Sequence, residues 1–135
     1  SYAPTRANWG DNNRSVALRL PAAPEQARRI EHRVAGADAN PYLVLACILQ
    51  GMMDGLAAGT EPPPALTGNA YDSATANRGE PLPADMHDAL SRFENSNFIE
   101  RALGVEMRSI LTAIKRAEIA GFANDISPLE RRTYL

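Results

Sequence analysis

The segment RRIEHRV, residues 28–34, has the alternating pattern of a short β-strand. Residues two apart share a face of a strand, so Arg29, Glu31 and Arg33 are expected to project together. Positive charge on both sides favours the ionised form of the Glu31 carboxylate. An ionised carboxylate can bind a divalent cation, and arginines offer forked donors to phosphate or carboxylate groups.

The segment NRSVALRL, residues 13–20, is a second strand candidate and ends at a proline. Together the two segments predict an antiparallel β-hairpin over residues 13–34 with a long connecting loop. Arg14 and Arg19 would add positive charge to the same patch. Their odd spacing puts them on opposite faces of a regular strand, so either Arg14 lies before the strand or a bulge intervenes. Spacing alone does not separate a working site from a solvated face with ordinary Arg–Glu pairs.

A long apolar run follows the predicted hairpin. Asn40 followed by proline predicts a helix start, and residues 41–58 are almost wholly apolar. The run is shorter than the roughly 20 residues that a membrane span needs, and Gln50 and Asp54 interrupt it. We therefore expect a buried core helix. Its glycines fall four apart, which predicts close approach to another backbone or a sheet; they are Gly51, Gly55 and Gly59.

The remainder of the chain divides into a loop and a helical part. Residues 60–83 hold five of the ten prolines and predict an irregular loop. Residues 84–135 show helical patterns, at about 84–93, 97–103 and 105–121 and again from Pro128. The fold class expected is α+β, with a short antiparallel β-hairpin followed mainly by α-helices.

Composition narrows the class of protein. The chain has 135 residues, 44% hydrophobic and 22% charged, which is typical of a soluble globular domain. Its net charge of −2 argues against broad nucleic-acid binding. A single cysteine, Cys47, excludes an internal disulfide and favours a reducing, cytoplasmic compartment. The chain begins without Met and stops two turns into a helix, so we expect a piece of a larger domain.

Four short motifs occur in a fixed order: NRS at 13–15, RLP at 19–21, RIEHR at 29–33 and ADANPYL at 37–43. In this order they resemble the C-terminal part of the glutamine synthetase catalytic domain, densely over residues 2–59 and more loosely to the end. The helical pattern after residue 83, through SPLE at 127–130, looks most like relatives that join glutamate to amines, the γ-glutamylputrescine synthetase type.

The resemblance implies ATP-dependent ligation, in which ATP phosphorylates the glutamate side chain and ammonia or an amine such as putrescine displaces the phosphate. Glu31 matches a ligand of the Mg²⁺ or Mn²⁺ ion that bridges the ATP phosphates. Arg33 matches the arginine that binds the glutamate carboxylate. Arg14 matches a catalytic residue that contacts phosphate and the transferring group. Arg19 and Arg29 match contacts to the ATP phosphates.

Two positions depart from the family pattern. Gln26 stands where the family often has a lysine that contacts ATP. Tyr2 stands where glutamine synthetases proper have a glutamate that helps to bind and deprotonate ammonium, which favours a larger amine. The resemblance also implies a large ring-shaped homo-oligomer, with active sites between neighbouring subunits. The present chain would then need the remainder of the catalytic domain and would be inactive alone.

Other side chains are interpreted more simply. Tyr71 lies near the adenylylated tyrosine of some bacterial glutamine synthetases, but its surroundings match poorly. The two histidines, His32 and His87, lack metal-ligand spacing. Cys47 is expected to pack in the core, and Trp9 and Tyr42 in the core or an interface. Two other classes stay open: a non-catalytic structural relative, as in lens proteins built on this domain, and a free-standing binding module using the proline-rich loop.

Overall fold

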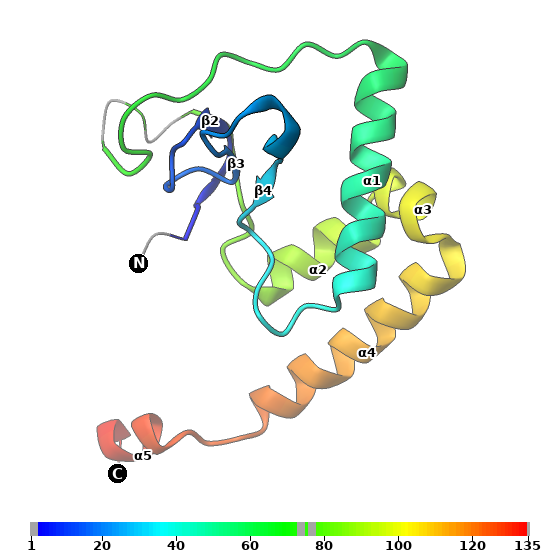
Figure 1. Cartoon of the computed structure of the whole chain (residues 1–135). Coiled ribbons are helices and arrows are strands. Elements are labelled where there is room, and N and C mark those ends of the chain that lie inside the picture. Colours follow the sequence, from blue (N-terminus) through cyan, green and yellow to red (C-terminus); the bar gives the residue numbers. More distant parts are fainter. Residues whose placement is uncertain (1–2, 73–74, 76–77, 135) are drawn as a thin grey trace. The chain divides into compact units, whose positions relative to one another are not determined.

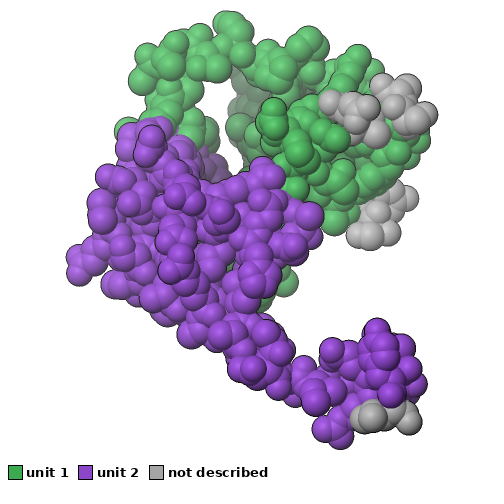
Figure 2. Space-filling view, turned by 180° about the vertical axis from the view of Figure 1, so that it is seen from behind, with its two compact units in different colours: residues 1–45, 51–82 green, residues 46–50, 83–135 purple. Residues whose placement is uncertain are grey.

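The computed structural model describes residues 3–72, 75 and 78–134 (Figure 1). These residues divide into two compact units, which lie within residues 1–45 and 51–82 and within residues 46–50 and 83–135 (Figure 2). The first unit holds small sheets and a long loop, and the second is helical. The α+β class expected from the sequence is confirmed.

A three-stranded sheet forms the centre of the first unit. It consists of β2 (Trp9–Asp11), β3 (Leu18–Leu20) and β4 (Glu31–His32), in that order. β3 and β4 are antiparallel, which confirms the predicted hairpin, and Arg19 lies opposite Glu31. β2 runs parallel to β3, a pairing that the strand patterns did not predict.

The hairpin is shorter than predicted, because residues 13–17 form a turn instead of a strand. The Asn13 amide donates to the carbonyls of Leu66 at 3.2 Å and Gly68 at 2.8 Å. The Ser15 hydroxyl donates to Asn13 Oδ1 at 2.7 Å and accepts from the Ala70 N–H at 2.9 Å. These bonds direct the segment towards the 66–70 chain and away from a β ladder.

The turn also supplies the apolar core of this unit. Val16 is fully buried and clusters with Leu66 and Ala70, which are 2% and 6% exposed. Gly10 lies against the same chain, since a Cβ there would approach the Leu66 carbonyl oxygen to 2.6 Å. The Trp9 indole N–H donates to the Pro63 carbonyl at 2.7 Å. The described part of the 60–83 loop is thus irregular, as predicted, but is anchored to the sheet.

Two short elements complete the first unit. β1 (Arg6–Ala7) pairs antiparallel with β5 (Glu80–Pro81), which joins the two ends of the unit's sequence. The loop between β3 and β4 contains a 3₁₀ turn, η1 (Glu25–Ala27), which includes Gln26. Both elements are two or three residues long, so they fix local chain direction and contribute little surface to a core.

The apolar run forms α1 (Pro41–Ala58) with caps of the predicted kind. Asn40 Oδ1 accepts from the N–H groups of Tyr42 and Leu43. The helix ends at Gly59, whose φ of 59° is the left-handed conformation that glycine adopts without steric cost. Gly59 therefore serves as a cap. Gly55 has open space where a Cβ would lie, so the expected close approach does not hold there.

The expected burial of α1 also does not hold within the described residues. None of its side chains is buried, and its large apolar residues are widely exposed, among them Tyr42 at 81% and Leu56 at 82%. An apolar helix is buried only when another element offers a matching face. By length and composition alone α1 would be able to cross a membrane, a test that core helices of soluble proteins also pass.

The second unit contains the predicted helices. They are α2 (Met86–Glu94), α3 (Asn97–Leu103), α4 (Val105–Ala123) and α5 (Pro128–Tyr134). α2 and α3 both pack on α4. Polar residues cap the helix starts: Ser96 accepts from the Ile99 N–H, and Ser127 and Glu130 exchange two hydrogen bonds in a capping box. The Ser127 backbone N–H lowers the pKa of the Glu130 carboxyl.

Truncation of Val16 tests the core of the first unit. Val16→Ala removes two buried methyl groups and is expected to lower the free energy of unfolding by about 1.5–3 kcal/mol. Val34→Ala is the matched control, because Val34 is 42% exposed, and should cost less than about 1 kcal/mol. Urea denaturation followed by circular dichroism measures both. Equal losses in the two variants would contradict the assignment of the core.

Candidate active site

The charged patch centres on the Glu31 carboxylate. Arg19 Nη1 lies 2.8 Å from Glu31 Oε2, and Arg33 Nη1 lies 2.7 Å from Glu31 Oε1. Arg19 reaches Glu31 across the sheet because the two residues are paired in the β3–β4 register. Arg33 reaches it because residues two apart project on one side of an extended chain. One carboxylate thus holds two guanidiniums.

This arrangement keeps Glu31 ionised. Hydrogen bonds first from Arg33 and then from Arg19 lower the pKa of the Glu31 carboxyl below its ordinary value of 4.5. The side chains of Arg19, Arg33 and Glu31 are 13%, 21% and 33% exposed, so the cluster lies half-buried with its carboxylate most accessible. Two cations and one anion leave an excess of positive charge, which favours an anionic ligand.

Arg19 makes a further contact at its other terminal nitrogen. Nη2 donates to Asn12 Oδ1 at 2.5 Å. The third donor, Nε, is buried and has no hydrogen-bond acceptor among the described residues. A buried donor without an acceptor costs free energy, so the ion pair and the Asn12 contact do not satisfy this side chain fully.

Two of the five predicted site residues lie outside this cluster. Arg14 is an exposed residue of the turn before β3, so the first of the two alternatives for its spacing applies. Arg29 lies before β4, is exposed, and donates to the Ala27 carbonyl at 3.4 Å. It is not part of the Glu31 cluster, because its guanidinium bonds to the Ala27 carbonyl and no described contact joins it to Glu31.

Glu31 retains the capacity to bind a divalent metal ion. Each of its oxygens accepts one arginine hydrogen bond, and a carboxylate oxygen can accept two. The described residues contain no group of three or more His, Cys, Asp or Glu that could hold a metal. The described residues therefore fit a site to which this chain contributes one metal ligand, Glu31. Arg19 and Arg33 fit an anionic phosphate or carboxylate.

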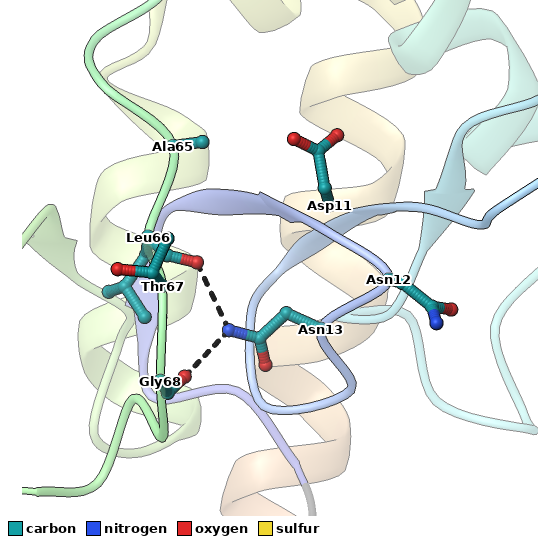
Figure 3. Close-up of a pocket in the computed structure, with 7 residues that line it drawn as sticks. All are labelled: Asp11, Asn12, Asn13, Ala65, Leu66, Thr67 and Gly68. Atoms are coloured by element: carbon teal, nitrogen blue, oxygen red, sulfur yellow. Dashed lines mark hydrogen bonds between the residues drawn. The ribbon is translucent and has the colours of Figure 1, made fainter.

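A separate open pocket of about 330 Å³ lies between β2 and the proline-rich loop (Figure 3). Residues 11–13 form one side and residues 65–68 the other. Figure 3 shows the Asn13 amide directed at Leu66 and Gly68, with the Asn12 side chain pointing away from them. Glu31 and the arginines do not line this pocket. The sequence did not reveal the side-chain hydrogen bonds of Asn12 and Asn13. Asn13 is the first residue of the NRS motif and Asn12 precedes it.

The remaining expectations had mixed outcomes. Trp9 is half-buried, whereas Tyr42 is exposed. Cys47 is half-buried, and burial raises the pKa of its thiol. The Tyr71 hydroxyl donates to the Ala3 carbonyl. Tyr2 lies outside the described residues.

A family model described as "Glutamine synthetase, catalytic domain" matches residues 1–134. The γ-glutamylputrescine synthetase PuuA of Escherichia coli is 40% identical over 129 residues, covering 96% of this chain and 26% of that protein. The glutamine synthetase of Methanocaldococcus jannaschii is 32% identical over 137 residues, covering 98% of this chain and 30% of that protein.

A solved structure shares the fold. The structure of apo GmaS without ligand superposes with a TM-score of 0.82 and is 31% identical, covering 98% of this chain and 30% of that chain. The chain thus spans between 26% and 30% of the length of these relatives.

The Glu31 cluster predicts a titration that NMR can measure. Because the folded-state pKa is lowered, the stabilisation from Glu31 is present above pH 4.5 and is lost as the pH falls through the lowered value. Arg33→Gln removes the largest cause and is expected to raise the Glu31 pKa towards 4.5. Arg29→Gln is the control and should leave it unchanged. Side-chain carboxyl ¹³C shifts followed against pH report both, and an equal rise in the two variants would contradict the cluster.

Proposed function

Because this chain belongs to the glutamine synthetase family, we propose that it forms part of the active site of an ATP-dependent ligase. The enzyme joins the side-chain carboxylate of glutamate to ammonia or an amine. The observation that carries the proposal is the Arg19–Glu31–Arg33 cluster, in which an ionised carboxylate and two guanidiniums lie within hydrogen-bond distance. A non-catalytic relative would have no need of this convergence of charge.

The proposed reaction has two steps. An oxygen of the glutamate side-chain carboxylate attacks the terminal phosphorus of ATP, which gives γ-glutamyl phosphate and releases ADP. The amine nitrogen then attacks the acyl carbon, loses a proton and expels phosphate. Phosphoryl transfer is catalysed mainly by positioning and by neutralising charge, and arginines with a metal-binding carboxylate suit both tasks.

Each residue of the cluster has a proposed role. Glu31 would supply one oxygen ligand to a divalent ion, whose charge would offset that of the ATP phosphates. Arg19 donates to the ATP phosphates through its guanidinium. Arg33 donates to the glutamate carboxylate through the forked geometry of its guanidinium.

Two exposed arginines complete the proposed site. Arg14 lies exposed in a turn, and Arg29 is exposed with one long hydrogen bond, 3.4 Å from Nη1 to the Ala27 carbonyl oxygen. Both side chains are therefore available for phosphate. We assign Arg14 to the transferring group and Arg29 to ATP.

The acceptor is proposed to be an amine larger than ammonium. At the sequence position where glutamine synthetases proper have the ammonium-binding glutamate, this chain has the uncharged residue Tyr2. The 40% identity to a γ-glutamylputrescine synthetase supports the same choice, against 32% for a glutamine synthetase. Putrescine is the acceptor to test first.

The chain is also proposed to work as part of a larger assembly. It spans less than a third of its relatives, so the remaining metal ligands and substrate contacts come from other parts of a longer polypeptide. The exposed apolar residues of α1 support burial against further protein. We propose a cytoplasmic ring-shaped homo-oligomer with this family's shared active sites.

The direct experiment measures phosphate release by the full-length protein. With ATP, Mg²⁺ and glutamate present, putrescine is expected to stimulate release more than ammonium at equal concentration. Formation of the γ-glutamyl amide is checked by mass spectrometry. Stronger stimulation by ammonium would reverse the acceptor, and no release with either acceptor would contradict this ligase function.

The metal role of Glu31 is tested by Glu31→Gln, which keeps the shape of the side chain but removes its charge. kcat/KM is expected to fall by roughly 10²- to 10³-fold, because a charge aimed at the reacting phosphates is lost. Glu61→Gln, at an exposed position of the proline-rich loop, is the matched control and should retain wild-type activity. Full metal-dependent activity in Glu31→Gln would overturn the assignment.

A further inference from the structure

Asn12 has a backbone conformation that few residue types adopt. Its φ is 48°, and it is the single non-glycine residue with a positive φ in the described part of the chain. This left-handed region is accessible to glycine and, at modest cost, to asparagine and aspartate. Asn12 directly follows β2, and its backbone N–H donates to the Leu20 carbonyl at 2.7 Å.

The side-chain amides of Asn12 and Asn13, on either side of this turn, have different hydrogen-bond partners. Asn13 bonds to the carbonyls of Leu66 and Gly68, whereas Asn12 bonds to Arg19. Figure 3 shows the two side chains pointing apart from this turn. Asn13 therefore ties the turn to the proline-rich loop, and Asn12 is free to reach the charged cluster.

The contact constrains the orientation of the Arg19 guanidinium. Nη1 is held by Glu31 at 2.8 Å and Nη2 by Asn12 at 2.5 Å. The guanidinium is planar, so two anchors on different nitrogens limit rotation of the whole group. Nε is then left as the buried donor without an acceptor among the described residues. The anchors thus determine where this donor points.

We infer that Asn12 is a positioning residue for nucleotide binding, acting through its hydrogen bond to Arg19. This inference rests on the proposed function, because it takes the ATP phosphates as the ligand of Arg19. Asn12 itself contacts no substrate. Its side-chain oxygen reduces the freedom that Arg19 must lose when phosphate binds, and preorganisation of this kind increases affinity.

A simpler explanation is that asparagine stands here only because the backbone is left-handed. In that case glycine would serve equally well, since it adopts this conformation more readily. Asn12→Gly therefore separates the two explanations, because glycine adopts the same backbone conformation and lacks the side chain that carries the acceptor. Asn12→Asp keeps an acceptor oxygen and also tolerates the conformation.

The test measures binding of β,γ-imido-ATP with Mg²⁺ to the full-length protein by isothermal titration calorimetry. Asn12→Gly is expected to raise the Kd about five- to tenfold, the order of the net contribution of one typical hydrogen bond. The Kd for glutamate and the Tm should remain near wild type. Asn12→Asp is expected to bind the nucleotide more tightly than Asn12→Gly.

Two controls assign the effect to Arg19. Asn124→Gly makes the same change at an exposed helix end of the other unit and should leave the nucleotide Kd unchanged. In an Arg19→Lys background, which lacks Nη2, Asn12→Gly should add less than about twofold. Independent, multiplicative effects of the two changes would overturn the proposed route through Arg19.

The outcomes also separate this inference from the proposed function. A wild-type protein that binds the nucleotide and ligates glutamate, with Asn12→Gly unchanged in Kd, would refute only the role of Asn12. Absence of nucleotide binding in the wild-type protein would refute both. An equal loss of glutamate affinity, or a large fall in Tm, would show that Asn12 acts on the fold and not on Arg19.

Discussion

The Glu31 carboxylate holds together two guanidiniums that would otherwise repel each other, and the geometry of the site depends on this interaction. Ion pairs of partly exposed groups contribute little to stability, typically about 0–1 kcal/mol each. Their effect here is positional. The β3–β4 ladder contains only two residue pairs, one of which is Arg19 opposite Glu31, so ladder register and ion pair specify the same alignment.

A second constraint determines where the hairpin can begin. Asn13 and Ser15 bind the 66–70 chain through side-chain hydrogen bonds, and Val16 is buried against it. The same contacts anchor the proline-rich loop and leave Arg14 exposed at the turn. The loop is therefore anchored to the turn that precedes β3, although its composition is typical of an irregular connection.

Local features of the fold were predictable from the sequence, and distant ones were not. Helix starts at Asn40, Ser96 and Ser127 depend on hydrogen bonds within three residues, so the motif suffices. The shape of the turn at Asn13 depends on partners more than 50 residues away, which no local pattern encodes. Helix α1 shows a related limit of sequence-based prediction. Its apolar composition indicates that it should pack against another element, but does not identify that element.

The candidate site was predictable to a similar extent. The alternating strand pattern correctly predicted that Arg33 lies beside Glu31, but it wrongly grouped Arg29 with them, since Arg29 precedes the ladder. The central claim, that this cluster binds metal and nucleotide, is tested most directly by a structure of the full-length protein with Mg²⁺ and β,γ-imido-ATP. A Glu31 oxygen is predicted about 2.0–2.1 Å from the ion, with Arg19 donating to a phosphate oxygen. An occupied nucleotide site whose metal lacks Glu31, with Arg19 still bonded only within this chain, would contradict it.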